Sequence, residues 1–363
     1  ARFATSVTGG LATRVAVQAQ QPLVNATRQA QQAQLRLGAD MGDIAWRGAQ
    51  ADLMLRTTER YLALAVAQER VRVVERQWQA VSRSRAEAHD RYQLGASPIT
   101  DTHEADAALA GVRAQQSAAE LELSVQRDRL AGSTGLAQPR ARLPLAPLAP
   151  VEALPFWLAA AESDNPRLRL LAQAVALAEQ KLRQHSVAGR ATLDLVAQAG
   201  HERIAGGGDF GSARNRSLNG MVGVQLNIPL YTGGMREAQE REAAERLNQA
   251  MAELELARED VAQQVRATWQ GLQTGAARLA ALQEGLVASP PRLDATRLGR
   301  EVGDRTTLDV LNAENAQADA ELALAQARSD QVLTRLRLAA LTDRLDEALL
   351  TQVDATLAPE VPR

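Results

Sequence analysis

The residue types that most often perform chemistry form no recognisable site in this chain. Its histidines, His89, His103, His185 and His201, include no pair at metal-ligand spacing, and no cysteine is present to complete a set of ligands. The glycine clusters at 206–208 and 233–234 lack the Lys-Ser/Thr pair and the helix of a phosphate-binding loop. No nucleophile motif is present. We therefore predict no catalytic residues, no metal, no cofactor and no enzymatic activity.

The composition favours long helices rather than thick globular cores. Hydrophobic residues make up 45% of the chain but aromatic residues only 3%, so the apolar content is mostly Ala, Leu and Val. Chains dominated by Ala, Glu, Arg, Leu and Gln are typical of long helices and coiled coils. The formal charge of −2, without a Lys/Arg block, argues against nucleic-acid binding. No run of about 18 apolar residues exists, so the sequence predicts no transmembrane helix.

An internal repeat organises the sequence. Pro22 lies 73 positions before Gly95, and Pro229 lies 74 positions before Gly303, so the two copies keep their spacing. At a constant offset of 208, Gly95, Asp101 and Ala105 correspond to Gly303, Asp309 and Ala313. A duplicated long unit requires a repeated structural element.

Each copy predicts a strand, a long helix, a glycine turn and a return helix. The helices are expected at about 25–93 and 99–130 in the first copy, with Asn25 as N-cap, and at 235–300 and 306–348 in the second. Short helices are expected at 155–187, beginning again at Asn165-Pro166. Alternating patterns predict strands at 11–20, 192–200 and 217–228, with Pro22 ending the first, and 204–215 is expected to be a flexible loop.

These elements predict four segments of the chain. The first repeat spans 1–136, an equatorial linker region spans 137–164, the second repeat spans 165–350, and 351–363 form an irregular C-terminal tail. At 1.5 Å per residue, a helix such as 25–93 would extend roughly 100 Å, so it must pack along partner helices.

Three segments together resemble the TolC-type outer membrane efflux proteins. The string VGDRTTLDVLNA at 302–313, followed by LALAQAR at 322–328, resembles the second hairpin of that family. YQLGASPITD at 92–101 resembles the first hairpin, and IPLYTGGM at 228–235 resembles the crossover from strand to helix. With the shared repeat order, the resemblance covers nearly the whole chain.

The resemblance implies a mainly α fold with a small β part. Long antiparallel helical hairpins of the repeat would form a trimeric α-helical barrel, and the strands a transmembrane β-barrel. A lone protomer would leave its strand edges unpaired in lipid, and closure with neighbouring copies would satisfy them. The repeat calls for four strands where three are predicted. We expect the missing strand, with a helix matching 165–187, to precede the first copy and to be either absent from this chain or not recognisable in it.

The resemblance also places a periplasmic gate at the hairpin turns, which Gly95 and Gly303 make. The gate positions are Thr100, Asp101 and Arg305. A charge-assisted hydrogen bond between Asp101 and Arg305 would be worth about 1–3 kcal/mol if partly desolvated. Alternatively, Asp101 caps the return helix and Arg305 is a solvated turn residue.

A pore ring and three departures complete the predicted entrance. Asp309, repeated around a threefold axis, is expected to form a ring of negative charge that favours cations; alternatively, it is a first-turn residue that favours the helix dipole. Arg300 stands where relatives have a gating tyrosine, and Asn312 where a second ring aspartate is common. Pro290 and Pro291 are expected to interrupt their helix, as a functional pivot or a tolerated bend.

The sequence therefore predicts a channel-tunnel that exports substrate across the periplasm and outer membrane of a Gram-negative cell. The match of both hairpins favours the outer membrane component of type I protein (toxin) secretion; drug or metal efflux is the alternative. Expected partners are two further copies in a homotrimer, a periplasmic membrane-fusion adaptor, an inner-membrane transporter of ABC type, outer membrane lipid, and a protein or small-molecule cargo. A periplasmic coiled-coil scaffold or adaptor is the alternative of another class, and the amphipathic strands argue against it.

Overall fold

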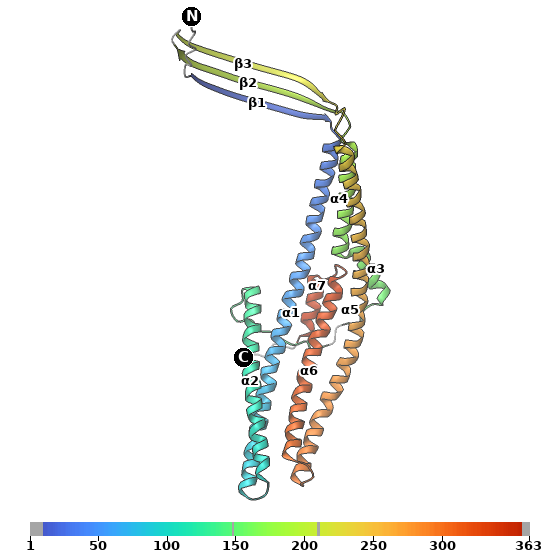
Figure 1. The fold of residues 1–363 in the computed structure, drawn as a ribbon. Helices are drawn as coiled ribbons and strands as arrows, with labels where there is room; N and C mark the ends of the chain where they lie inside the picture. The colour runs from blue at the N-terminus through green and yellow to red at the C-terminus, as the bar shows by residue number, and fades with distance from the viewer. Residues whose placement is uncertain (1–9, 147–148, 209–210, 358–363) are drawn as a thin grey trace. The chain divides into compact units, whose positions relative to one another are not determined.

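The computed structural model describes residues 10–146, 149–208 and 211–357. Along the chain its elements are β1 (Gly10–Val24), α1 (Ala26–Gln93), α2 (Ile99–Thr134), α3 (Leu154–Asp164), α4 (Pro166–Val187), β2 (Thr192–Gly208), β3 (Gly211–Asn227), α5 (Met235–Glu301), α6 (Thr307–Ala340) and α7 (Glu347–Thr356) (Figure 1). They divide into two compact units. Unit 1 contains 1–43 and 170–255, and unit 2 contains 44–169 and 256–363, so each unit takes residues from both predicted repeats.

Unit 1 contains an antiparallel sheet in the order β1-β2-β3. Its strands are longer than predicted. β1 continues past Pro22 to Val24 with a register shift between these two residues, because proline has no N–H to donate to the ladder. The predicted loop at 204–215 is wrong, since β2 and β3 remain paired as far as Gly208 and Gly211. Cross-strand hydrogen bonds outweigh the low strand propensity of the glycines there.

The register gives the sheet two unlike faces. One face carries mainly apolar rows, each written from β1 to β3: Val24, Leu193 and Leu226; Gln21, Leu195 and Val224; Ala19, Ala197 and Val222; Val17, Ala199 and Gly220; Val15, His201 and Leu218. The opposite face carries polar rows: Gln18, Gln198 and Met221; Ala16, Gly200 and Asn219; Arg14, Glu202 and Ser217. Much of the apolar face is exposed, with Val222 at 77% and Leu218 at 83%.

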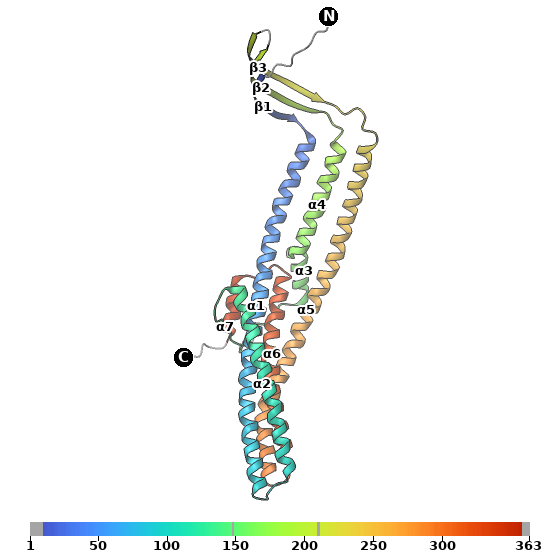
Figure 2. The ribbon, with the colours of Figure 1, turned by 60° about the vertical axis from the view of Figure 1, so that its left-hand side comes forward.

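Helical segments of α1, α4 and α5 complete unit 1 (Figure 2). Asn25 caps α1 as predicted, because its Oδ1 accepts a hydrogen bond of 2.9 Å from the Arg28 N–H. Within this unit, α1 and α4 are joined where Gln34 Nε2 donates to Gln184 Oε1 at 2.7 Å. Asn165, the predicted start of α4, likewise accepts from the Leu168 N–H at 3.1 Å.

Unit 2 contains two helical hairpins, formed by α1 with α2 and by α5 with α6. Its core consists of small and medium side chains, as the composition predicts, including a cluster of Val74, Val81, Leu109, Val112 and Leu311 from α1, α2 and α6. A second cluster joins Leu293 of α5 to Val310 and Ala313 of α6. Figures 1 and 2 show both hairpin turns at the same end of this unit. Within the described residues, none of the helices has the length and apolarity needed to cross a membrane.

Two predictions about unit 2 are wrong. The helix expected to break at Ser289-Pro290-Pro291 continues to Glu301 with both prolines inside it. Pro290 leaves the Leu286 carbonyl without its helical donor, and Ser289 Oγ donates to that carbonyl at 2.9 Å. The return helix expected to reach 348 ends at Ala340, and α7 occupies part of the predicted irregular tail. The end of that tail, 358–363, lies outside the described residues.

Candidate functional site at the hairpin turns

The two predicted turn glycines have the backbone conformation that the predicted turns require. Gly95 has φ +71° and Gly303 has φ +82°, a left-handed region in which side chains with a Cβ are strained. The N–H of the residue after each glycine bonds the carbonyl five positions back, Ala96 to Arg91 and Asp304 to Gly299, both at 2.8 Å. This is a helix-ending Schellman motif in both copies.

Asp309 closes a capping box at the start of α6. Its Oδ2 accepts from the Thr306 backbone N–H at 2.9 Å and from the Thr306 hydroxyl at 3.0 Å, while its own N–H donates to Thr306 Oγ1 at 3.1 Å. The backbone N–H of Thr306, then its hydroxyl, and then the charge of Arg305 hold the pKa of Asp309 below its ordinary value. The carboxylate therefore keeps its charge at lower pH than an ordinary aspartate.

Asp101, at the equivalent position of the repeat, makes a different contact. Its Oδ2 accepts from the hydroxyl of Thr307 at 3.0 Å, which joins α2 of the first hairpin to α6 of the second. Pro98 is the N-cap of α2 and offers no side-chain cap, so Asp101 has no capping box to close. Thr307 is buried, whereas the neighbouring gate position Thr100 is exposed.

Arg305 lies in the second turn with its side chain exposed. Its stem covers Gly299, where a Cβ would lie 2.7 Å from the Arg305 Cγ. Among the described residues of one protomer, Arg305 forms no ion pair, so within a single copy the partner of Asp101 is Thr307 instead. A bond from Asp101 of one protomer to Arg305 of another protomer of the trimer stays a prediction. Asn312, which lies on α6 where relatives commonly have a second ring aspartate, is exposed.

Arg300 has a buried position and a partner that sequence reasoning missed. Only 9% of the residue is exposed, and its Nη2 lies 2.5 Å from Glu87 Oε1 on α1. The Nε of Arg300 is buried without a hydrogen-bond partner. Glu87 lies eight positions before Gly95, and Arg300 lies three before Gly303. The pair thus links the two hairpins near their turns.

Further polar contacts lie within the second hairpin and between the two hairpins. Arg297 of α5 lies 3.0 Å from Glu314 of α6, whose side chain is only 5% exposed. Gln77 of α1 donates to Asn315 of α6 at 2.6 Å. Arg76 of α1 is also paired with Glu321 of α6. The interior of unit 2 near the turns is therefore crossed by hydrogen bonds and ion pairs as well as apolar contacts.

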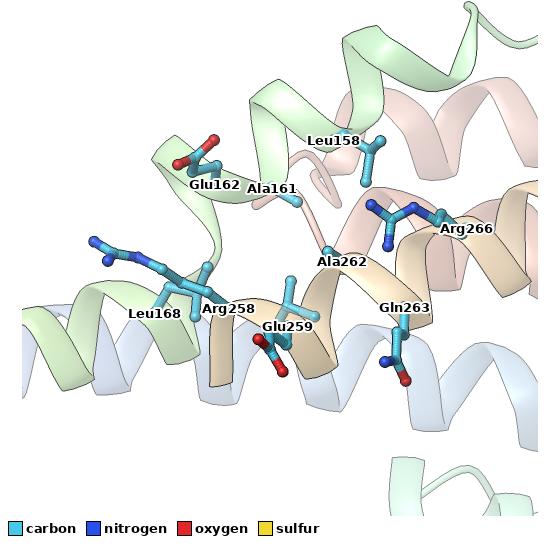
Figure 3. Close-up of a pocket in the computed structure, with 10 residues that line it drawn as sticks. Leu158, Ala161, Glu162, Leu168, Arg258, Glu259, Ala262, Gln263 and Arg266 are labelled. Atoms are coloured by element: carbon cyan, nitrogen blue, oxygen red, sulfur yellow. The ribbon is translucent and has the colours of Figure 1, made fainter. Parts of the chain in front are cut away.

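A hollow of unit 2 lies elsewhere, between α3, α4 and α5 (Figure 3). It has a volume of about 390 Å³ and is lined by Leu158, Ala161, Leu168, Val261 and Ala262, with Glu162, Arg258, Glu259, Gln263 and Arg266. The part of the chain that the structure describes holds no group of three or more His, Asp or Glu side chains suited to a metal ion.

Comparisons with known proteins match most of the chain. A family model described as outer membrane efflux protein matches residues 157–344. The outer membrane efflux protein BepC of Brucella suis is 34% identical over 202 residues, 56% of this chain and 43% of BepC. The outer membrane protein TolC of Vibrio cholerae is 28% identical over 331 residues, 88% of this chain and 74% of that protein. The chain thus spans less than half of BepC and about three quarters of this TolC.

Two further similarities concern a secretion protein and a solved structure. The alkaline protease secretion protein AprF of Pseudomonas aeruginosa is 28% identical over 326 residues, 87% of this chain and 66% of AprF. The crystal structure of the outer membrane protein VceC of Vibrio cholerae is similar with a TM-score of 0.71 at 16% identity, covering 94% of this chain and 89% of VceC. At that identity the similarity concerns the fold.

Proposed function

This chain belongs to the outer membrane efflux protein family, and from this premise we propose that three copies of it form a channel that exports substrate across the periplasm and the outer membrane. The predicted resemblance to TolC-type proteins and the predicted mainly α fold are confirmed. The predicted localisation, in the outer membrane and extending into the periplasm, is confirmed as well.

The observation that carries the proposed channel is the two-faced sheet of unit 1. One face exposes Val222, Val224 and Leu226, and the other exposes glutamine and asparagine side chains. Among the described strands, β1 and β3 are the outer ones, and each pairs on one side only with β2. Lipid tolerates neither unpaired backbone groups nor open sheet edges, so neighbouring copies must pair with both edges. Closure in this way leaves the apolar face towards lipid and the polar face towards an aqueous lumen.

A periplasmic scaffold or adaptor accounts for the helices but not for this sheet. Such a protein would expose Val222 and Leu218 to water, where a large apolar patch promotes association. The exposed apolar rows therefore favour the channel.

The hairpin turns are proposed to form the gate of this channel. Asp101 accepts from Thr307 inside one copy, and a carboxylate has further lone pairs free for a guanidinium. Arg305 is exposed at the same end of unit 2 and carries such a group. A bond from Arg305 of one copy to Asp101 or Thr100 of the next would hold the three entrances together. Asp309 would then form the negatively charged ring.

Protein secretion is the cargo class that we favour. It is supported by the name of AprF, a protease secretion protein, whose alignment covers most of this chain. Efflux of small molecules is the second candidate, because BepC is named an efflux protein. If the cargo is protein, a periplasmic adaptor and an inner-membrane transporter of ABC type would act together with the passive channel. The transporter would supply the energy for export.

One complementation experiment tests the channel and its cargo. In a strain lacking the gene, the parent protein should restore either secreted protein in the medium or resistance to small toxic compounds, and these readouts separate the two candidates. Val222→Arg should lower the amount of outer membrane trimer, because arginine on the lipid face near the midplane costs about 2–4 kcal/mol. Met221→Arg is the control, because this neighbouring residue lies on the polar face. Equal effects of both substitutions would contradict the proposed barrel wall.

A further inference from the structure

Two arginines lie side by side on the otherwise apolar face of the sheet. Arg203 of β2 and Arg216 of β3 are direct cross-strand partners, and Thr13 of β1 completes their row. The next row towards the helices contains Val15, His201 and Leu218, and the rows beyond it are apolar except for Gln21. Both arginines are exposed, and within the described residues neither forms an ion pair. The row therefore offers two positive charges and the hydrogen-bond donors of two guanidinium groups, beside the hydroxyl of Thr13.

This arrangement is unfavourable unless an anion joins it. Like charges directly opposite each other on neighbouring strands repel, with Cβ atoms only about 4.5–5.5 Å apart. The opposite face shows how the same strands neutralise an arginine, because Arg14 there lies 2.8 Å from Glu202. Among the residues that the structure describes, Arg203 and Arg216 have no such carboxylate partner. Two arginine side chains that start from directly opposite positions can reach one phosphate from two sides, and phosphate is a group whose geometry guanidinium matches well.

The position of the row identifies the source of the phosphate. Arg203 lies ten positions along β2 from Leu193, where the apolar rows begin next to the helices. Ten residues of strand span about 33 Å. At a tilt of about 40° this is about 25 Å along the membrane normal, the height of the apolar band of an outer membrane barrel. The row is thus at the edge of the hydrocarbon layer, on the side away from the helices and so at the outer leaflet.

We propose that Arg203 and Arg216, with Thr13, form a binding site for the phosphate group of an outer-leaflet lipid, whose acyl chains lie along the rows from Leu218 to Leu226. The proposal rests on the proposed function, in which this face of the sheet contacts lipid. Each trimer would hold three such sites. Lipid bound there would remove the repulsion between the two arginines and fix the depth of the sheet in the membrane.

Purified full-length trimer, titrated in detergent with diphosphorylated lipid A and examined by native mass spectrometry, tests this site. The parent should retain lipid A, and the double variant R203Q/R216Q should bind it at least about tenfold more weakly, because each hydrogen bond to a charged group is worth that much or more. Arg14→Gln is the matched control. It removes one positive charge from the neighbouring row on the opposite face and should leave lipid A binding unchanged.

Two probes identify what is recognised. Lipid A from which both phosphates have been removed should bind the parent as weakly as lipid A binds the double variant. Inorganic phosphate at millimolar concentration should displace little lipid A, because it lacks the acyl chains. Efficient displacement by inorganic phosphate would assign the row to free anions and overturn the lipid site. Equal retention of lipid A by the parent and R203Q/R216Q would overturn the site altogether.

Single-channel conductance of every variant separates this inference from the proposed function. A parent chain that forms no trimer and no conducting channel contradicts the proposed function. A conducting R203Q/R216Q channel that keeps its lipid A contradicts only the lipid site. A conducting R203Q/R216Q channel that has lost lipid A supports both.

Discussion

At the scale of single residues, Asp101 and Asp309 occupy equivalent positions of the repeat and make different bonds. Thr306 precedes Asp309 by three positions and supplies the hydroxyl and N–H of a capping box. The equivalent residue before Asp101 is Pro98, which has neither group, so Asp101 bonds Thr307 of the other hairpin instead. The two repeats thus differ by threonine in one and proline in the other at this position. Because of this difference, Asp309 caps its own helix whereas Asp101 joins the two hairpins.

The capping box makes the charge of Asp309 resistant to acid. Since the folded-state pKa is lowered, the bonds of the carboxylate stabilise the fold above the ordinary aspartate pKa and are lost as pH falls through the lowered value. Cation selectivity of the parent channel should therefore persist below the pH at which an ordinary aspartate titrates. Thr306→Ala removes the hydroxyl bonds, so selectivity should be lost at higher pH.

Reversal potentials across planar bilayers between about pH 3 and 7 measure this difference. Asp309→Asn should abolish the pH-dependent part of the selectivity, and Asp304→Asn, in the exposed turn, serves as the control. Identical titration of parent and Thr306→Ala channels would show that Asp309 does not set the selectivity.

Arg300 and Glu87 make the second prediction at this scale. Glu87→Gln leaves a buried guanidinium with a neutral partner and should destabilise each protomer by about 1–2 kcal/mol, less than a fully buried pair because Glu87 is half-exposed. Adding Arg300→Met should recover part of the loss by removing the unpaired charge. The temperature at which the trimer dissociates provides the measurement.

The matched control for this pair is Asp52→Asn. Asp52 and Arg56 lie one turn apart on α1, and both side chains are more than half exposed. Their contribution should stay below about 1 kcal/mol. If Glu87→Gln changes the dissociation temperature no more than Asp52→Asn does, the Arg300 contact does not help to hold the hairpins together.

At the scale of elements, local signals predicted the beginnings of helices better than the ends of strands. Asn25, Asn165 and the turn glycines act within a few residues, so their effect can be read directly from the sequence. The extension of β2 to Gly208 depends on pairing with β3, which no local pattern reveals. The continuity of α5 through Pro290 depends on packing and on the Ser289 hydroxyl, and so the helix survives a residue that normally interrupts it.

The turn glycines give a prediction about elements. Gly303→Ala places a Cβ in a left-handed conformation and should destabilise the second hairpin of each protomer by about 1–2 kcal/mol. Gly111→Ala is the control inside α2, where nothing lies within 4 Å of the new Cβ and alanine should stabilise the helix by up to about 1 kcal/mol. Dissociation temperatures of the two trimers should therefore shift in opposite directions. A shift in the same direction would contradict the role of Gly303 as a turn residue.

At the scale of the whole molecule, the repeat order and the motifs at 92–101, 228–235 and 302–313 were enough to predict the family. The partner of Arg300 was not predictable from the sequence, because Glu87 lies 213 positions away in the first repeat of the same chain. The same is true of the contact from Thr307 to Asp101 across the hairpins. The turn glycines were enough to locate the entrance in the sequence. The contacts between the two hairpins could be identified only from the three-dimensional structure.

The gate is a property of the assembled trimer, so its test belongs at this scale. Replacing both Asp101 and Arg305 by Ala should raise single-channel conductance and admit larger antibiotics to cells. Each bond contributes only about 1–3 kcal/mol, but three symmetric copies act on one closed state. Asp101→Ala alone also removes the Thr307 contact, so Thr307→Val separates the two roles: it breaks only the link inside one copy. If Thr307→Val opens the channel as far as the double variant does, the lock lies within each protomer. If neither variant changes the conductance of an intact trimer, these residues are not the lock, and the Arg300–Glu87 pair is the next to be broken.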